Sequence, residues 1–282
     1  MAAPQNTIAI IFDFDDTLTD DSTTKLLEAH GIDAVDFWQN QNKKQVDAGW
    51  NPTLSYLKLL LDNVGKGKPL GQLSNKKLHE FGESLTFYDG IPEIFPDLEN
   101  IVREHKVSNP SIEFYIVSGG LEEIIRGSKI ASYFGGIWGC KFAEERGAIK
   151  YIMRSISFTE KTKFLFEINK GINLVQREPY AVNRYVAPAD RRIPFENMIY
   201  LGDGLTDVPC FSLLNMFRGK AFGIFDPRKQ GSPKKGWEQL VVPRRVNTLN
   251  SPHYGEHDDL GALLRTAVKE ICLRMDVRTQ TA

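Results

Sequence analysis

The chain has 282 residues, of which 41% are hydrophobic and 25% are charged, the composition of a folded protein with a sizeable core. It carries 35 basic and 36 acidic residues, so its formal net charge is -1. This balance disfavours a nucleic-acid-binding protein and a protein that attaches to an anionic membrane surface. The length predicts one large domain or two unequal ones.

The cysteine count and the N-terminal residues indicate the cellular compartment in which the protein is expected. Cys140, Cys210 and Cys272 are far apart and form no C-x-x-C pair, which disfavours a disulfide framework and a zinc motif and is typical of a reducing compartment. Aspartates interrupt the first apolar run, unlike that of a signal peptide, and no run approaches the length of a membrane span. We therefore expect a cytoplasmic protein.

Three short apolar runs, residues 7–14, 112–117 and 198–201, are predicted to be buried strands. Each ends in small or acidic residues, and amphipathic helices are predicted over residues 121–130 and 159–169. Strands that alternate with helices form a parallel sheet, and ligands bind beyond the carboxyl ends of its strands. The three polar strand ends should therefore converge on one site.

The stretch between the first two strands is too long for one crossover helix. It carries four segments with helical spacing of apolar residues, at residues 22–30, 35–48, 53–63 and 75–84. We predict a small all-helical domain over residues 21–88, inserted into an α/β core made of residues 1–20 and 89–282.

Three later segments complete the predicted core. Residues 137–142 and 149–153 should form a hairpin around a turn at residues 144–147. Residues 171–194, rich in Arg, Pro and Asn, have no clear period and suggest a surface excursion, whereas residues 260–275 should form a helix that packs on the sheet.

Two acidic pairs follow the first and third strands. Side chains alternate along a strand, so Asp13 and Asp15 can face one ligand while Asp16 points elsewhere, although capping aspartates would give the same pattern. Asp203 and Asp207 lie in a glycine-bounded turn, and two carboxylates four residues apart suit a magnesium ion.

The second strand and the helix over residues 159–169 offer partners for a phosphate group. Ser118, with backbone N–H groups from Gly119 and Gly120, and Lys161 could surround phosphoryl oxygens. A solvated lysine and a capping serine are the alternative interpretation, and Lys163 is the competing lysine.

At this point the order of motifs matters. The chain carries, in sequence, DFDDTLT, IVSGG, EKTKFL and LGDGLTD, which resemble the four signature motifs of the haloacid dehalogenase (HAD) superfamily. The resemblance spans residues 7 to about 209. It implies a doubly wound, Rossmann-like parallel sheet, and the helical insertion after the first motif resembles the cap of the phosphoserine-phosphatase-like branch.

The resemblance also implies roles for residues. Asp13 would be the nucleophile that forms an aspartyl-phosphate, and Asp15 would be the general acid and then the base. Ser118, Gly119 and Lys161 would bind the phosphate, and Mg²⁺ would be held by Asp13, the backbone carbonyl of Asp15, Asp203 and Asp207.

Charge counting agrees with these roles. Four ionised aspartates contribute -4, and Mg²⁺ with Lys161 returns +3, so protonating Asp15 brings the empty site to neutrality and supplies a proton for the leaving alkoxide. The acid two residues after Asp13 favours phosphoryl transfer over halide release, because halide needs no proton.

Several other residues have two interpretations. Phosphoserine phosphatases bind the substrate amine through a Glu nine residues after the nucleophile, where this chain has Ser22, so the resemblance does not carry phosphoserine specificity. Trp38, Trp50 and Tyr56 could line a substrate pocket or pack inside the cap.

Charged and histidine-containing loops are similarly open. The basic segment at residues 226–236 and the pair Arg191 and Arg192 could meet an anionic substrate or be solvated loops. His253 and His257 are four residues apart but have no third ligand nearby in the sequence, which favours a polar loop over a metal site.

The leading hypothesis is a magnesium-dependent phosphatase that hydrolyses a small-molecule phosphate monoester, with neither a nucleic acid nor a membrane as partner. The first alternative is a phosphotransferase or phosphomutase that uses the same aspartyl-phosphate. A binding protein that keeps the fold without rapid hydrolysis is a further alternative.

Overall fold

The computed structural model describes residues 5–172, 178 and 180–281, and its centre is a seven-stranded sheet of order β4-β3-β2-β1-β5-β6-β7. All neighbouring strands are parallel except β3 and β4, which pair antiparallel. The strands are β1 (Thr7–Phe12), β2 (Ser111–Leu121), β3 (Phe134–Glu145), β4 (Ala148–Arg154), β5 (Met198–Gly202), β6 (Lys220–Ile224) and β7 (Thr248–Asn250). The predicted α/β fold with a mostly parallel sheet is confirmed.

Strand β1 lies between β2 and β5, and all six of its residues are buried. Ile10 pairs with Phe114 of β2 on one side and with Ile199 of β5 on the other. This explains why the run is apolar without alternation, since both faces of a central parallel strand are covered. The strand ends at Phe12, two residues earlier than predicted, directly before Asp13.

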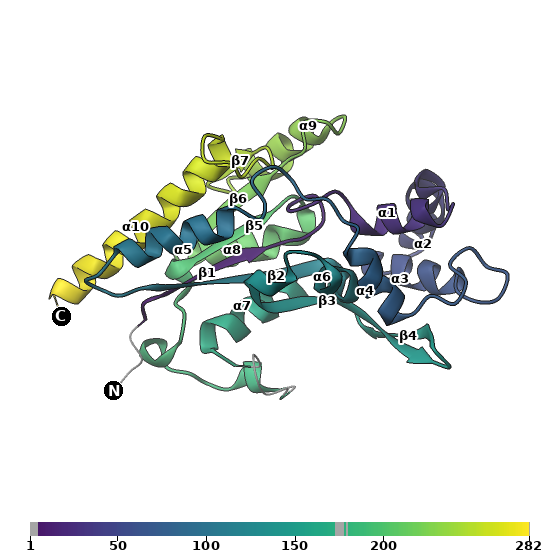
Figure 1. The fold of residues 1–282 in the computed structure, drawn as a ribbon, viewed down its shortest axis with the longest axis horizontal. Coiled ribbons are helices and arrows are strands. Elements are labelled where there is room, and N and C mark those ends of the chain that lie inside the picture. Colours follow the sequence, from purple (N-terminus) through teal and green to yellow (C-terminus); the bar gives the residue numbers. More distant parts are fainter. Residues whose placement is uncertain (1–4, 173–177, 179, 282) are drawn as a thin grey trace.

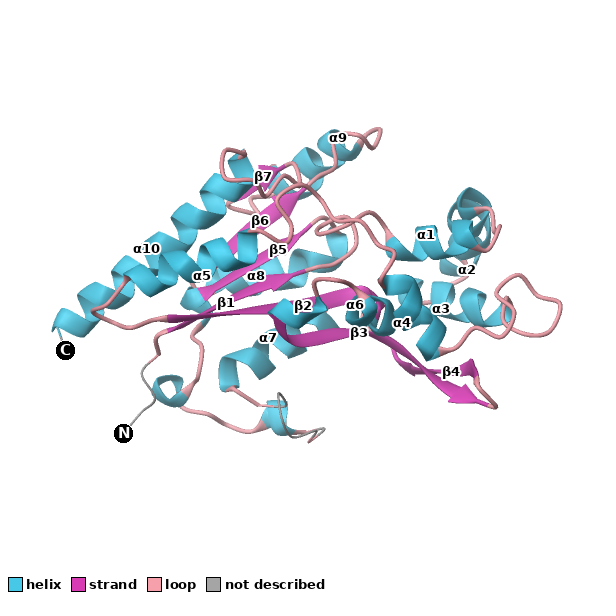
Figure 2. Cartoon of the chain, viewed as in Figure 1, coloured by secondary structure: helices cyan, strands magenta, loops and turns pink. Residues whose placement is uncertain are grey.

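Helices cover both faces of the sheet (Figures 1 and 2). Helix α5 (Ile94–Glu104) packs against α10 (Asp259–Thr281), while α7 (Glu160–Lys170) packs against α8 (Val208–Met216). The predicted C-terminal helix is present and extends to Thr281. Helix α6 (Glu122–Gly127) follows β2 at once and is shorter than the predicted 121–130.

The segment between β1 and α5 is helical, as the sequence predicts. It contains α1 (Ser22–Ala29), a π-helical stretch (Asp36–Asn42) that continues into α2 (Lys43–Asp47), α3 (Pro52–Asp62) and α4 (Asn75–Gly82). Asn51 caps α3 by accepting hydrogen bonds from the backbone N–H groups of Thr53 and Leu54. Figure 1 shows these helices beyond the carboxyl ends of β1 and β2.

This helical segment makes two close contacts with the core. Glycines let α4 and α6 approach each other: a Cβ on Gly82 would lie 2.1 Å from the carbonyl oxygen of Ile124, and one on Gly127 would lie 1.8 Å from that of His79. The backbone N–H of Ile149 in β4 donates to Leu73, 2.9 Å away. The β3–β4 hairpin, predicted from its turn, therefore reaches the inserted helices.

Part of the predicted excursion at residues 171–194, namely residues 173–177 and 179, lies outside the described residues. The described part includes the short 3-10 helices Ala181–Asn183 and Pro188–Asp190. Arg192 binds Glu113 near the start of β2. The starts of the parallel strands lie at the opposite end of the sheet from the polar carboxyl ends, so this arginine does not serve the predicted site.

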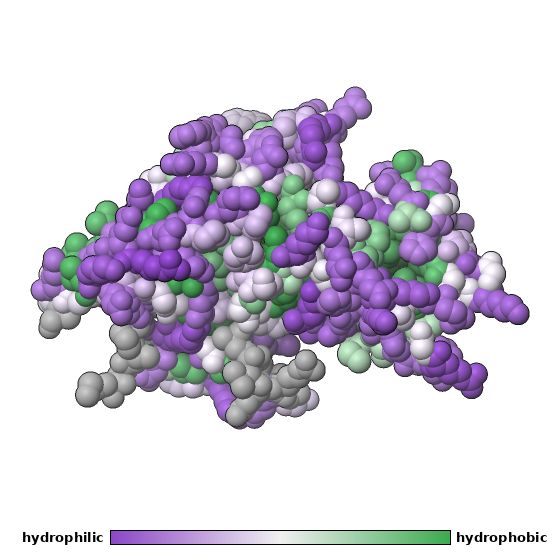
Figure 3. Space-filling model, viewed as in Figure 1, coloured by the Kyte–Doolittle hydropathy of each residue, from purple (hydrophilic) through white to green (hydrophobic). Residues whose placement is uncertain are grey.

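The surface is consistent with the balanced composition. The face shown in Figure 3 is mostly hydrophilic, with smaller apolar areas among the polar ones. None of the helices in the described part of the chain combines the length and the apolar character needed to cross a bilayer.

Gly127→Ala should lower the free energy of unfolding by about 1–3 kcal/mol, because the added methyl group collides with backbone that cannot move aside. Gly135→Ala is the matched control: its Cβ would meet the nearest atom at 3.7 Å, an ordinary contact, and should change stability by less than about 1 kcal/mol. Urea unfolding measures both. Equal stability of the two variants would contradict the close crossing of α4 and α6.

Candidate active site

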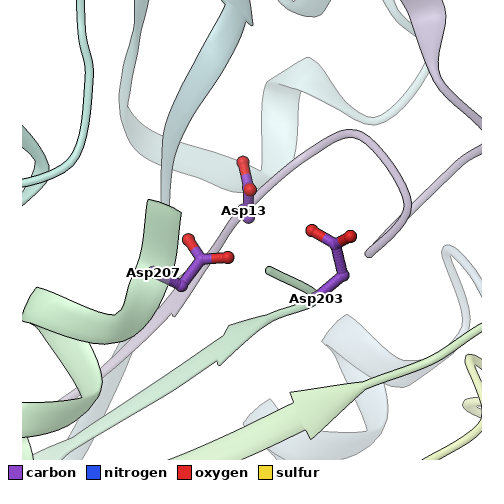
Figure 4. A group of neighbouring side chains, drawn as sticks. All are labelled: Asp13, Asp203 and Asp207. Carbon is purple, nitrogen blue, oxygen red and sulfur yellow. The ribbon is translucent and has the colours of Figure 1, made fainter. Parts of the chain in front are cut away.

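Three carboxylates meet at the carboxyl ends of the central strands. Asp13 follows β1, and Asp203 and Asp207 follow β5; one oxygen from each lies within 4.8 Å of the others. Figure 4 shows the three side chains gathered at the ends of these strands. The predicted convergence of the first and third strand ends is confirmed.

A buried lysine joins two of these carboxylates. Lys161, in the first turn of α7, places its Nζ 2.8 Å from Oδ2 of Asp13 and 2.7 Å from Oδ1 of Asp207. Burial alone would lower the pKa of Lys161, but the two carboxylates raise it, so the side chain stays charged. Lys163 is exposed and lies 3.6 Å from Glu167, so of the two lysines it is Lys161 that contacts the carboxylates Asp13 and Asp207.

Both carboxylate oxygens of Asp207 are bound by neighbouring groups. Its Oδ1 also accepts a hydrogen bond from the Tyr200 hydroxyl at 2.7 Å, and its Oδ2 accepts one from the backbone N–H of Gly204 at 3.1 Å. A Cβ on Gly202 would lie 2.5 Å from this carboxylate. Asp207 therefore holds Lys161 in place.

Asp13 and Asp203 are more available to a ligand. Oδ1 of Asp13 accepts a hydrogen bond from the backbone N–H of Phe14 at 2.7 Å. Burial raises the pKa of Asp13 to about 6 although Lys161 acts to lower it, and burial followed by repulsion from Asp207 and Asp13 raises the pKa of Asp203 well above its usual range. Neighbouring buried carboxylates of this kind are stabilised by a divalent cation, and hard oxygen donors suit Mg²⁺.

Asp15 and Asp16 leave the strand end in different directions. Oδ1 of Asp15 accepts a hydrogen bond from the backbone N–H of Ser22 at 2.7 Å, and burial raises the pKa of Asp15 well above its usual range. Asp16 has φ 57° and its carboxylate pairs with Lys229. Asp16 thus has a partner of its own, although it still borders the cavity described below.

The end of β2 completes this part of the site. Ser118 is buried, and its Oγ accepts a hydrogen bond from the backbone N–H of Gly120 at 2.9 Å. Gly120 is required here by close approach, because a Cβ at this position would lie 2.4 Å from Oδ2 of Asp15. The second strand end therefore lies beside the first.

These residues border a cavity of about 170 Å³. The core contributes Asp13, Asp15, Asp16, Ser118, Gly119, Gly120, Asp203 and Thr206 to its wall. The helical segment contributes Asp21, Thr23, Trp38 and Tyr56. The cavity thus lies between the strand ends and the inserted helices.

The sequence did not predict two contacts of the aromatic residues. The Tyr56 hydroxyl donates a hydrogen bond to the carbonyl oxygen of Gly119 at 2.5 Å, and the Trp38 indole N–H donates one to Oγ1 of Thr24 at 2.9 Å. Trp50 is 44% exposed and does not border the cavity. Helical spacing alone could not separate these aromatic residues, because the partners lie on other elements.

The basic loop reaches the border of the cavity through Lys229, which pairs with Asp16. Arg228 pairs with Asp20 and Asp226, and the His253 Nδ1 atom lies 3.6 Å from Oδ2 of Asp89. In the described part of the chain, the one group of three close histidine, cysteine or acidic side chains is Asp13, Asp203 and Asp207. The histidine pair therefore forms no such site there, in agreement with its interpretation as a polar loop.

Comparison with known proteins shows which family the chain belongs to. No protein-family model matches it. A protein of Borreliella burgdorferi, described as an uncharacterized protein, is 32% identical over 233 residues, which cover 75% of this chain and 79% of that protein. The chain belongs to the same family as this Borreliella protein.

Solved structures extend the comparison to the fold. A HAD family hydrolase from Salmonella enterica serovar Typhi has a TM-score of 0.60 at 14% identity over 92% of this chain and 71% of its own. A substrate-bound phosphoserine phosphatase has a TM-score of 0.56 at 15% identity over 92% of this chain and 98% of its own. A phospho-aspartyl intermediate analogue of phosphoserine phosphatase has a TM-score of 0.55 at 15% identity over 93% and 99%.

The protein therefore has the fold of HAD-family hydrolases, in its phosphoserine-phosphatase-like form. Within this HAD fold, the three carboxylates are a possible metal site, and their oxygen donors fit the magnesium predicted from the sequence.

Lys161→Met should lower the free energy of unfolding in metal-free buffer by about 3 kcal/mol, because it leaves Asp13 and Asp207 buried without their cation. Lys163→Met provides the control at an exposed position of the same helix and should change stability by less than about 0.5 kcal/mol. Denaturant unfolding in metal-free buffer measures the free energy of unfolding of both variants. A Lys161 variant as stable as the Lys163 variant would contradict the proposed bridging role.

Proposed function

We propose that this protein is a magnesium-dependent phosphatase that hydrolyses a small-molecule phosphate monoester through an aspartyl-phosphate at Asp13. The observation that carries the proposal is that Asp13 and Asp203 border one cavity and that the buried Lys161 contacts Asp13. A phospho-aspartyl intermediate analogue is described for a phosphoserine phosphatase of the same fold, which supports this chemistry.

In the first step, a carboxylate oxygen of Asp13 forms a bond to phosphorus while the bond from phosphorus to the ester oxygen breaks. The departing alkoxide takes the proton of Asp15, which borders the same cavity and whose burial favours the protonated form. In the second step, a water oxygen forms a bond to phosphorus while the bond from phosphorus to the Asp13 oxygen breaks, Asp15 accepts a proton from that water, and free phosphate and the Asp13 carboxylate are released.

Phosphate binding is assigned to Ser118, Gly119 and Lys161. The Ser118 hydroxyl, which accepts the Gly120 N–H, and the backbone N–H of Gly119 are the assigned hydrogen-bond donors, and Lys161 balances the charge of Asp13. Removing such a charge partner costs on the order of a hundredfold in turnover or more.

Asp13, Asp203 and the backbone carbonyl of Asp15 would hold Mg²⁺, and Asp207 would support them. When bound, the ion would neutralise negative charge that the phosphate brings into this acidic site. Both oxygens of Asp207 already accept hydrogen bonds, so we assign Asp207 mainly to positioning Lys161.

We assign residues 21–88 to a cap that covers the reaction and selects the substrate. Asp21, Thr23, Trp38 and Tyr56 of this segment border the cavity, whose volume suits a small ester. A substrate-bound phosphoserine phosphatase shares the fold, but the sequence resemblance expects an amine-binding Glu at position 22, where this chain has Ser22, and Ser22 does not border the cavity. The proposal therefore does not include phosphoserine.

The direct test is release of free phosphate and p-nitrophenol from p-nitrophenyl phosphate. The wild-type protein should require added Mg²⁺, and Asp13→Asn should lose about a thousandfold of the rate or more, because an amide does not replace the nucleophile. Asp47→Asn, at an exposed position paired with Lys43, is the control and should keep the wild-type rate. Full activity of the Asp13 variant would overturn the mechanism, and nitrophenol released without free phosphate would instead indicate transfer to an acceptor.

A further inference from the structure

The cavity wall made by the helical segment combines aromatic rings with a carboxylate. We infer that the substrates are phosphate monoesters of amino alcohols, in which the leaving alcohol carries an ammonium group and no acidic group. This inference rests on the proposed phosphatase function and concerns the same site.

The aromatic part of this wall consists of Trp38 and Tyr56. Their ring centroids are 5.7 Å apart with an angle of 52° between the planes, and both residues border the cavity. The indole N–H is bound to Thr24 and the phenol hydroxyl is bound to the Gly119 carbonyl, so their hydrogen-bond donors are already used. Tyr56 is largely buried and the Trp38 ring also packs against Phe37, so only the part of each ring that borders the cavity can meet a ligand, and aromatic rings attract organic cations.

The charged part of this wall points to the same ligand. Asp21 borders the cavity, and none of the described residues that border it is a lysine or an arginine. Lys229 contacts the bordering residue Asp16 but is already paired with that carboxylate. A carboxylate or second phosphate on the leaving group would face like charges without a cationic partner, whereas an ammonium group would be attracted.

The size of the cavity is compatible with a short leaving group. A volume of about 170 Å³ is sufficient for a phosphate with a short amino alcohol. Trp38 and Tyr56 belong to the helical segment, whereas the proposed nucleophile Asp13 belongs to the core. An ester that spans the cavity therefore places its phosphate at Asp13 and its alcohol beside Trp38, Tyr56 and Asp21.

Kinetics with a pair of isosteric esters tests this inference. Choline phosphate and its uncharged isostere 3,3-dimethylbutyl phosphate differ only in nitrogen against carbon, and their kcat/KM ratio should be about ten or more. Ethanolamine phosphate should also be hydrolysed faster than phosphoserine, which adds a carboxylate to the same skeleton.

Asp21→Asn is the variant of choice, because Asn replaces Asp as the cap of α1 and keeps the helix start intact. It should lower the cationic-to-neutral ratio severalfold, mainly through a higher KM for choline phosphate. Asp33→Asn is the control, since Asp33 is an exposed acid that also accepts a backbone N–H, from Asp36, and does not border the cavity. It should keep the wild-type ratio.

The outcomes separate the inference from the function on which it rests. If p-nitrophenyl phosphate is hydrolysed but the wild-type ratio for the isosteric pair is near one, or if Asp21→Asn leaves that ratio unchanged, the inference is overturned and the phosphatase stands. If no phosphate ester is hydrolysed with Mg²⁺ present, the proposed function itself fails.

Discussion

The structure depends on one buried ion cluster, in which Lys161 bridges Asp13 and Asp207. The three residues come from the start of α7 and from the ends of β1 and β5, so the cluster joins segments that are distant in the sequence. A buried carboxylate without a cation is costly, and a buried lysine without an anion is equally costly. Each group is therefore stable in this place only because the others are present.

The same cluster also leaves one of its carboxylates, that of Asp13, accessible to a ligand. Lys161 and Asp207 satisfy each other and Tyr200 adds a further hydrogen bond, whereas Asp13 and Asp203 border the cavity. In the proposed function, Asp207 positions Lys161, whereas Asp13 reacts with the phosphate and Asp203 would hold Mg²⁺. A preorganised arrangement of this kind does not have to reorganise when phosphate charge arrives.

The helical segment is tied to the core at points beside the phosphate-binding strand end. Tyr56 holds the Gly119 carbonyl, and Thr53 Oγ1 donates to the Ile156 carbonyl at 3.4 Å, shortly before α7. The glycine crossing of α4 and α6 adds a third tie. In our account the wall that selects the leaving group and the strand ends that bind phosphate therefore share hydrogen bonds, so a substrate that fits the wall is aligned with Asp13.

Some of these features could be predicted from the sequence and others could not, for physical reasons. The buried run of β1 and the polar residues after β1, β2 and β5 predicted the sheet and the meeting of its ends, because both follow from local pattern and strand direction. Strands β6 and β7 and helices α5 and α8 were not predicted. Tyr200 and the partners of Tyr56 were also missed, since a contact between distant segments leaves no periodic signal in either. The sequence resemblance already assigned Lys161 rather than Lys163, and the structure adds that Lys161 contacts Asp13 and Asp207 while Lys163 is exposed.

The central claim is that Asp13 carries the phosphoryl group during turnover. Acid quenching of the enzyme with a good substrate and Mg²⁺, followed by borohydride reduction and peptide mass spectrometry, measures this directly, because an aspartyl-phosphate is reduced to homoserine. The account predicts homoserine at position 13 in a substantial fraction of molecules, dependent on substrate and absent without it. Continued release of free phosphate with unmodified aspartate at position 13, or with the modification at Asp15 or Asp203 instead, would contradict it.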